Sequence, residues 1–588
     1  MTTDTDIIGF SFGHDATVVL LRDGKVEVAL MEERTSRVKK YIGFPHTALK
    51  AVRERYTFRP KQELFADGVE HGIYIINTKQ DVIDYRNRQP DRRWFLKALL
   101  ERFGLGEAAY GTIRFLRSLK KSPQGIVRNF LEREFPGATI SNVPHHLSHA
   151  WSTVYFMPDR TKRRLILTLD GQGDDLCGSI NIFENGTIRP LHEFPTGNSL
   201  GLLYASCVDL LGMSRNEHEF KVMGLAPYAK PSSGEKVYQE LKKILWFNTE
   251  TLKLESAFDM RRGTQYLIAH EFYRFRFDSI AYGIQKLTEE IIKDMARAAI
   301  AKYNCADLAV AGGVFMNVKA NQYLREMPEV RSLVITPSAG DESIALGNAA
   351  YGYAKLNDNN LFGLKPIANL YLGTTYTDAE IKAAIADYDF ADIAVETTYF
   401  DPAEGFTVEE KVAEILASNS VVGRFKGRAE WGARALGNRS ILANPSSRDN
   451  VKLINEMIKG RDFWMPFATS LLFERRNEYL EDADDFLAPY MAITFRTKQK
   501  AHTDLIAALH PYDLTSRPQM VQKETNPEYH ALISYFAAKT GIGGILNTSF
   551  NLHGEPNVET PYDALRTFAL SGLPHLALGN YLISKKSK

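Results

Sequence analysis

Cysteine is scarce in this sequence. Only Cys177, Cys207 and Cys305 occur among 588 residues. None of them belongs to a CxxC pair or has the spacing from histidine that a zinc ribbon needs, so we expect neither a disulfide framework nor a zinc ribbon. This use of cysteine fits a reducing compartment and predicts a cytoplasmic protein.

Long apolar runs and an excess of one charge are also lacking. No run is long enough to span a bilayer, so no membrane partner is expected. The N-terminal MTTDTDIIGF has neither the basic nor the apolar region of a signal peptide. Lys and Arg number 72 against 71 Asp and Glu, a formal net charge of +1, so no global field draws the chain to nucleic acid or anionic membrane.

The sequence does contain a repeated pattern of short strands. DIIGFSFG, ATVVLL and VEVALMEE, with the hairpin signal RDGK, are followed later by RRLILTLDGQGDD, GSINIF and IRPLHEF, with the hairpin signal ENGT. Two similar halves are typical of the actin-like ATPase fold, although two unrelated antiparallel sheets would give the same pattern. The chain is long enough for two to four domains.

Later segments add helices and a linker. An amphipathic helix is predicted between Phe275 and Tyr303. The polar stretch at Lys355–Pro366 is the best linker candidate, and we place the main domain boundary there. The predicted domains are therefore residues 1–360 and 366–588.

Three of the fourteen histidines lie in NVPHHLSHAWS. A helix that begins after Pro144 would place His145 and His149 on one face, where two imidazoles can hold a transition or zinc-like ion. Asp170 and Asp341 each follow a predicted strand and are candidates to complete the ligand set. The alternative is a chance HxxxH on a helix surface, with no metal.

Glycine-rich turns are the second candidate feature. DGQGDD and AGGVFMN place glycines after predicted strands, where backbone N–H groups can cradle phosphates. These turns offer Asp170, Gly171, Gly173, Gly312 and Gly313 to a nucleotide. No GxxxxGK[ST] is present, and no GxGxxG opens a helix, so P-loop and Rossmann interpretations lose support.

The third feature is a basic segment. Residues 424–461 hold nine Lys and Arg against three acids. Arginine forks suit phosphate and carboxylate, so we favour an anion site over a solvated surface run. ILNTSFN could offer Asn547, Thr548 and Ser549 to the same anion. A second basic stretch, residues 81–134, predicts a helical insertion with a solvated face, and less favourably a nucleic-acid patch.

Taken together, nine motifs resemble the O-carbamoyltransferases of antibiotic and nodulation-factor biosynthesis. They are GHDATVVLL, HHLSHAWS, LTLDGQGD, KVMGLAPY, GGVFMN, SAGDESIALGNA, EWGARALGNRSILANP, HPYDLTSRPQ and GGILNTSFNLHGEP. The resemblance implies an α/β protein with a duplicated actin-like (Kae-like) ATPase-type domain over 1–360, carrying the basic insertion at about 81–134. A YrdC-like α/β domain that binds carbamoyl phosphate would follow over 366–588.

The same resemblance implies a reaction. Carbamoyl phosphate and ATP would give carbamoyl-adenylate, and the carbamoyl group would then pass to a hydroxyl of a small-molecule acceptor, a sugar or natural product. Iron(II) or a similar divalent ion would lie in the N-terminal domain. Mg²⁺ and a homodimeric assembly are left open. Two alternatives remain: the same chemistry on a hydroxymethylated base in DNA, and an actin-fold ATPase without carbamoyl transfer.

The resemblance also assigns residues. The implied metal ligands are His145, His149, Asp341 and, as a fourth, Asp170. The implied nucleotide contacts are Gly312, Gly313 and Asn317. His14 would face the acceptor hydroxyl as a base, with a pKa near its ordinary value of ~6.5. Carbamoyl phosphate would be held by Arg434, Arg517 and Asn547, with Lys459 and Ser549 as catalytic residues. Arg517 lies in LTSRPQ, where the family commonly has DGTARVQ.

Overall fold

The structure is a computed structural model that describes residues 4–70, 125–391, 393–484 and 486–586. The chain divides into two compact units. Unit 1 comprises Met1–Glu32 and Lys40–Ile367, and unit 2 comprises Glu33–Lys39 and Ala368–Lys588. The second junction lies just past the predicted linker. The assignment of the short segment Glu33–Lys39 to unit 2 was not expected from the sequence.

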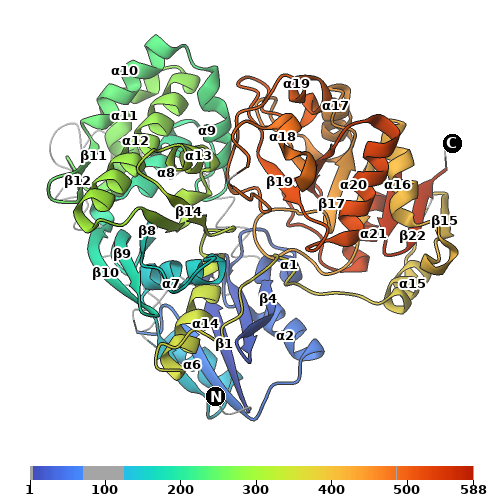
Figure 1. The fold of residues 1–588 in the computed structure, drawn as a ribbon, viewed down its shortest axis with the longest axis horizontal. Helices are drawn as coiled ribbons and strands as arrows, with labels where there is room; N and C mark the ends of the chain where they lie inside the picture. The colour runs from blue at the N-terminus through green and yellow to red at the C-terminus, as the bar shows by residue number, and fades with distance from the viewer. Residues whose placement is uncertain (1–3, 71–124, 392, 485, 587–588) are drawn as a thin grey trace. The chain divides into compact units, whose positions relative to one another are not determined.

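Unit 1 contains the same five-stranded sheet twice (Figure 1). In each sheet three antiparallel strands are followed by two parallel ones, in the orders β4-β3-β1-β6-β7 and β10-β9-β8-β13-β14. The first sheet consists of β1 (Thr5–Ser11), β3 (Thr17–Arg22), β4 (Lys25–Met31), β6 (Lys61–Ala66) and β7 (Thr139–Asn142). The second consists of β8 (Arg164–Gly173), β9 (Leu176–Glu184), β10 (Thr187–Pro195), β13 (Asp307–Ala311) and β14 (Ser332–Ile335). The predicted duplication is confirmed, and two unrelated antiparallel sheets are excluded.

The sequence signals explain this topology locally. Asp23 and Gly24 have φ angles of 50° and 76°, as the type I′ turn of a tight hairpin requires between β3 and β4. The continuous apolar run of β1 is buried from Asp6 to Ser11 because helices cover the sheet. Parallel strands bring their carboxyl ends to one edge, which is where the candidate site residues lie.

Helix α14 (Glu342–Leu356) packs closely between β1 and α7 (His145–Ser152). A Cβ atom at Gly347 would lie 1.7 Å from the carbonyl oxygen of Ser148, and one at Gly9 would lie 2.1 Å from that of Ala345. Ser148 Oγ also donates a hydrogen bond to Asn348 Oδ1 at 2.6 Å. These small residues fix α14 so that its N-cap, Asp341, comes to the histidine helix.

Helix α12 (Phe277–Tyr303) confirms the amphipathic helix predicted between Phe275 and Tyr303. It belongs to a helical layer whose other members are α8 (Leu200–Leu210), α9 (Glu219–Leu225), α10 (Pro231–Lys242), α11 (Gly263–Ala269) and α13 (Val318–Arg325). Among the described residues, no helix combines the length and apolarity that crossing a membrane would require.

Unit 2 is built on one eight-stranded mixed sheet, in the order β15-β22-β21-β16-β17-β20-β18-β19. Its strands are β15 (Val395–Tyr399), β16 (Val422–Phe425), β17 (Arg439–Ala443), β18 (Ala468–Leu472), β19 (Pro518–Val521), β20 (Gly544–Ser549), β21 (His575–Leu578) and β22 (Tyr581–Lys585). One core packs α16 (Val408–Ala417) and α20 (Pro527–Thr540) on the sheet, and a second packs α15 (Asp378–Asp387), α17 (Asp449–Ile454) and α21 (Pro561–Leu570). The α/β class of this part is confirmed, and its likeness to YrdC stays a prediction.

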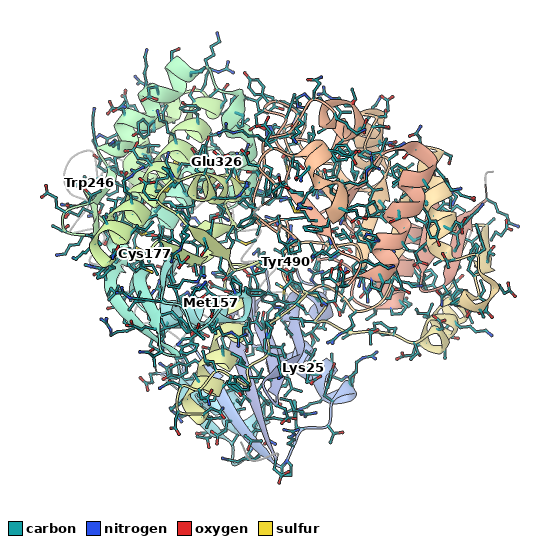
Figure 2. The ribbon with its side chains drawn as sticks, in the orientation of Figure 1. Lys25, Met157, Cys177, Trp246, Glu326 and Tyr490 are labelled. Atoms are coloured by element: carbon teal, nitrogen blue, oxygen red, sulfur yellow. The ribbon has the colours of Figure 1, made fainter. Side chains whose placement is uncertain are left out.

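The predicted basic insertion falls mostly outside the described residues, at 71–124. Its described end is α6 (Ile126–Glu134), which buries Val127, Phe130 and Leu131. The three cysteines are buried and form no disulfide, and Cys177 lies in β9 (Figure 2). The expected lack of a disulfide framework is therefore confirmed.

Candidate functional site

Four side chains of unit 1 meet at the edge where α7, β8 and α14 come together. His145, His149, Asp170 and Asp341 each offer one ligand atom, and these atoms all lie within 4.8 Å of one another. The Nε2 atoms of both histidines lie 3.4 Å from Asp170 Oδ2, and that of His149 lies 3.5 Å from Asp341 Oδ1. The four residues predicted as metal ligands are thus brought together.

The donor set fits a divalent transition ion. Two imidazole nitrogens and two carboxylates are ligands that Fe²⁺ or Zn²⁺ accepts. Asp341 Oδ1 is buried and accepts no hydrogen bond, an arrangement that is costly unless another partner binds it. His149 is fully buried, so its ring is held for a local partner and not for solvent.

Charge in this cluster is strongly coupled. Burial alone would lower the pKa of His145, but the carboxylates of Asp341, Asp170 and Asp67 outweigh it and raise that pKa well above its ordinary value. Burial would also lower the pKa of His149, but the carboxylates of Asp170 and Asp341 outweigh it and raise that pKa. Both shifts favour the protonated rings, and a cation that binds there must displace those protons.

Supporting residues hold the two histidines in place. The Nδ1 atom of His149 is hydrogen-bonded to Ser343 Oγ at 3.2 Å, and His145 Nδ1 lies 3.6 Å from Asp67 Oδ2. Asp174 Oδ2 accepts from the His145 backbone N–H at 2.8 Å. A Cβ at Gly173 would lie 2.1 Å from His145 Cδ2, so this glycine makes room for the ring. Sequence reasoning missed Asp67, which directly follows β6, because the segment before it was not predicted as a strand.

His146 is not part of the cluster. Its Nδ1 is hydrogen-bonded to Thr168 Oγ1 at 3.1 Å. Burial, together with the charges of His145 and His149, lowers its pKa to about 3, so it stays neutral. This agrees with a packing role for the middle histidine.

His14 joins the cluster from β2 (Gly13–His14), which pairs with β5 (Ile42–Gly43) in a separate two-stranded sheet. Its Nε2 lies 3.0 Å from Asp341 Oδ2 and its Nδ1 lies 3.1 Å from Asp15 Oδ2. The Asp341 carboxylate raises the pKa of His14 to about 10, far from the ordinary value expected for a base. Lys40 Nζ donates to both oxygens of Asp15 at 3.0 and 2.9 Å. His14 can therefore accept a proton only after the charge of Asp341 is offset.

The Gly-Gly turn lies against the end of β8. Gly312 has a φ of 97°, and a Cβ at Gly313 would lie 2.7 Å from Asp170 Oδ1. The N–H of Gly312 is already bonded to Ala339 O at 2.9 Å, and that of Gly171 to Asp170 Oδ1 at 2.7 Å. The N–H groups of Gly312 and Gly171 are therefore already bonded within the protein.

Asn317 has a structural partner in this arrangement. Its Oδ1 caps α13 by accepting from Ala320 N at 3.1 Å, and its amide pairs reciprocally with Gln285 at 2.8 and 3.0 Å. Tyr204 and Glu289 extend this network through Gln285. Burial raises the pKa of Glu289 to about 7. These polar residues were missed because nothing in a helix sequence marks a side chain that joins such a network.

Unit 2 gathers cations at the ends of β20 and β19. Lys459 is the last residue of a π-helical turn at Asn455–Lys459, a geometry frequent at functional sites. Its Nζ donates to Ser549 Oγ at 3.2 Å and to Asn551 Oδ1 at 2.8 Å. Arg461 Nη2 donates to Thr548 Oγ1 at 2.8 Å. Lys459 is only 3% exposed.

These cations repel one another. Burial, then the charges of Arg461 and Lys39, lower the pKa of Lys459 well below its ordinary value. Burial, then Arg434 and Arg461, do the same to the pKa of Arg517. Among the described ion pairs, no carboxylate partners Lys459, Arg461 or Arg517. Lys459 is buried, whereas Arg461 and Arg517 are half-buried. A buried charge without a counter-ion is costly, so an anionic ligand is the natural complement.

Asn547 lies beside this cluster on β20. Its Nδ2 donates to Ser470 Oγ at 3.0 Å, while its Oδ1 is buried and accepts no hydrogen bond. The structure thus brings Lys459 to Ser549, and Asn547 lies two residues before Ser549 on the same strand. The charge of Arg434 acts on both Arg461 and Arg517, so these three arginines lie within electrostatic reach of one another. Asn551 and Arg461 are additional polar residues of the cluster that were not among the predicted site residues.

Unit 1 thus combines a duplicated sheet with a candidate cation site, and unit 2 holds a cluster of cations without carboxylate partners. Family models agree with this: Carbamoyltransferase N-terminus matches residues 6–350 and Carbamoyltransferase C-terminus matches residues 413–585. The chain therefore belongs to the carbamoyltransferase family and is an enzyme of that class.

Two curated relatives support the assignment. Nodulation protein NolNO of Sinorhizobium fredii is 30% identical over 98% of this chain and 80% of its own length. The 3'-hydroxymethylcephem-O-carbamoyltransferase of Amycolatopsis lactamdurans is 28% identical over 50% of this chain and 52% of its own. A solved structure, HypF of T. kodakarensis, is 12% identical over 61% of this chain and 48% of its own, with a TM-score of 0.32, which is too low to define the fold.

Proposed function

We propose that this carbamoyltransferase is ATP-dependent and transfers the carbamoyl group of carbamoyl phosphate to a hydroxyl by way of carbamoyl-adenylate. The observation that carries the proposal is the pairing of two buried sites with opposite charge deficits. Unit 2 holds cations without carboxylate partners, which suit a phosphorylated donor. Unit 1 holds a candidate cation centre at the carboxyl edge of an ATPase-type sheet.

In unit 2 the cations would neutralise the phosphate of carbamoyl phosphate. Water cleaves the carbamoyl–phosphate bond, which releases inorganic phosphate and carbamate. Lys459 Nζ would stabilise the charge on the departing phosphate, and Ser549, 3.2 Å from it, would orient the same group. The unsatisfied Asn547 Oδ1 is suited to accept a hydrogen bond from the carbamoyl NH₂ group.

In unit 1 a carbamate oxygen attacks the α-phosphorus of ATP, and pyrophosphate leaves. The acceptor hydroxyl then attacks the carbamoyl carbon, and the bond to AMP breaks. This activation is needed because nitrogen donates into the carbamoyl carbonyl and makes it a poor electrophile. Both carbamate and its adenylate decompose in water, so the burial of the two sites protects the intermediates.

His145, His149, Asp170 and Asp341 are the residues that would hold iron(II) or a similar divalent ion. When bound, the ion would offset phosphate charge and the carboxylate charge of Asp341. His14, 3.0 Å from Asp341, would then have its pKa lowered toward the neutral range and could take the hydroxyl proton. The protonation state of His14 would thus depend on whether the metal ion is bound.

The test is to incubate the protein with ATP and labelled carbamoyl phosphate against a panel of hydroxyl compounds, read by mass spectrometry. We expect AMP, pyrophosphate, phosphate and a carbamoylated sugar or natural product, as in antibiotic biosynthesis. Hydroxymethylated DNA in the panel examines a nucleic-acid acceptor. Formation of ADP without carbamoyl phosphate would overturn the proposal in favour of an actin-fold ATPase. Parallel arms with added Fe²⁺ and Mg²⁺ identify the required ion.

A further inference from the structure

The segment Glu33–Lys39, here called the strap, lies inside the sequence of unit 1 but belongs to unit 2. Both flanking residues are anchored in unit 1. The Glu32 carboxylate accepts from the backbone N–H groups of Thr47 and Ala48 at 3.0 and 2.8 Å. On the other side, Lys40 donates to Asp15. The strap is therefore held at both ends and is not a free loop.

Arg37 fastens the strap to unit 2. Its guanidinium donates to the carbonyl oxygens of Asn557 at 2.5 Å and Pro556 at 2.9 Å. Its Nε also lies 3.5 Å from Asp563 Oδ1. Every guanidinium nitrogen of Arg37 thus has a protein partner, as expected for a residue with a structural role.

Arg34 is different. It is 3% exposed, and its Nη2 donates to the carbonyl oxygen of Gly432 at 2.7 Å. Its Nε and Nη1 have no hydrogen-bond partner. The carboxylate of Glu33 lies 3.6 Å from Nε, beyond hydrogen-bond distance. A guanidinium is always charged, and a buried donor without a partner is destabilising.

The strap borders the cation cluster of unit 2. Gly432, which Arg34 contacts, lies two residues before Arg434 in the EWGARALGN loop. At the other end of the strap, Lys39 is close enough to Lys459 for its charge to act on that ammonium. The unsatisfied donors of Arg34 therefore belong to the same region as the buried cations that need an anion.

We propose that Arg34 is a binding residue of the unit 2 anion site and that its free N–H groups bind the phosphate of the donor. The inference rests on the proposed function for the identity of that donor, carbamoyl phosphate. An Nη1 group offers two N–H donors, and charge-assisted bonds from guanidinium to phosphate are among the strongest in proteins. A bound phosphate would remove the cost that Arg34 carries in the free protein.

The experiment compares Arg34→Ala and Arg34→Lys in the full chain with the wild type. Binding of carbamoyl phosphate and of inorganic phosphate is measured by calorimetry, and KM is measured for both substrates. We expect about 10- to 100-fold weaker binding of both anions, because a hydrogen bond to a charged group is worth about 1.5–3 kcal/mol. The KM for ATP should not change. Added guanidinium should restore part of the loss in Arg34→Ala.

Arg37→Ala is the matched control, because it loosens the same strap without removing a donor from the site. Wild-type anion binding by Arg34→Ala, or equal losses in both variants without rescue by guanidinium, would overturn the inference. Thermal melting separates misfolding from lost binding, and Arg34→Lys keeps the charge if Arg34→Ala fails to fold. A wild type that binds phosphate but does not turn over carbamoyl phosphate would overturn the proposed function and leave the role of Arg34 testable.

Discussion

The two candidate sites are opposite in charge. In unit 1, Asp170, Asp341 and Asp67 surround two histidines and leave a carboxylate oxygen without a hydrogen bond. In unit 2, Lys459 and Arg461 face one another without a carboxylate partner. One site is short of a cation and the other is short of an anion. Each site therefore carries an unbalanced charge that only its own ligand would neutralise.

The largest expected effect follows from removing a metal ligand of unit 1. His149→Ala should weaken metal binding more than about 100-fold, because losing even a residue behind a ligand typically costs 10–100-fold. Metal content after purification and a metal titration measure it. His146→Asn is the control, since His146 lies on the same helix but faces Thr168. Unchanged metal content in His149→Ala would contradict the ligand assignment.

Removal of a cation from unit 2 should affect only the donor. Lys459→Ala should lower kcat/KM for carbamoyl phosphate about 50-fold, from the loss of a charged hydrogen bond. Transfer from supplied carbamoyl-adenylate should continue. Lys452→Ala, on an exposed lysine of α17, is the control. Equal loss of both activities would show that the two sites do not act separately.

A smaller effect is expected behind the metal ligands. Asp67→Asn should weaken metal binding about tenfold, because the carboxylate 3.6 Å from His145 Nδ1 orients that ring and favours its ligating form. The measurement is a competitive titration with a chelator. Metal affinity equal to that of the wild type would mean that Asp67 only packs against the ring.

The smallest expected effect is a change of ligand affinity with pH, in opposite directions at the two sites. Metal affinity should rise with pH, because His145 and His149 have raised pKa values and must lose protons to bind. Affinity for carbamoyl phosphate should fall as pH rises through the lowered pKa of Lys459, since only the protonated ammonium attracts the anion. Calorimetry of each ligand across pH measures both slopes. If both affinities changed in the same direction with pH, the opposite charge of the two sites would be contradicted.

Much of the fold could be predicted because its signals are local. The Asp-Gly hairpin, the repeated three-strand pattern and the long helix α12 all follow from turn residues and periodicity. The assignment of residues 33–39 to unit 2 could not be predicted, because it depends on contacts with residues some 400 to 500 positions away. No local pattern encodes such a partner.

The candidate metal cluster could be predicted because its residue types and helix spacing carry the signal. HxxxH sets two rings on one face, and aspartates after strands converge at one sheet edge. The raised pKa of His14 could not be predicted, since its value of about 10 comes from Asp341, which is 3.0 Å away in space but distant in sequence. Asp67 and the Asn317–Gln285 pair could not be predicted for the same reason.

The strap has a consequence for how the chain can be divided. A fragment that begins at Ala368 contains all of the eight-stranded sheet but lacks Arg34 and Arg37. A C-terminal fragment cut at the junction between the family models would thus lack the contacts that the strap makes with unit 2. A synthetic peptide of residues 33–39, or co-expression of the N-terminal fragment, would have to restore them.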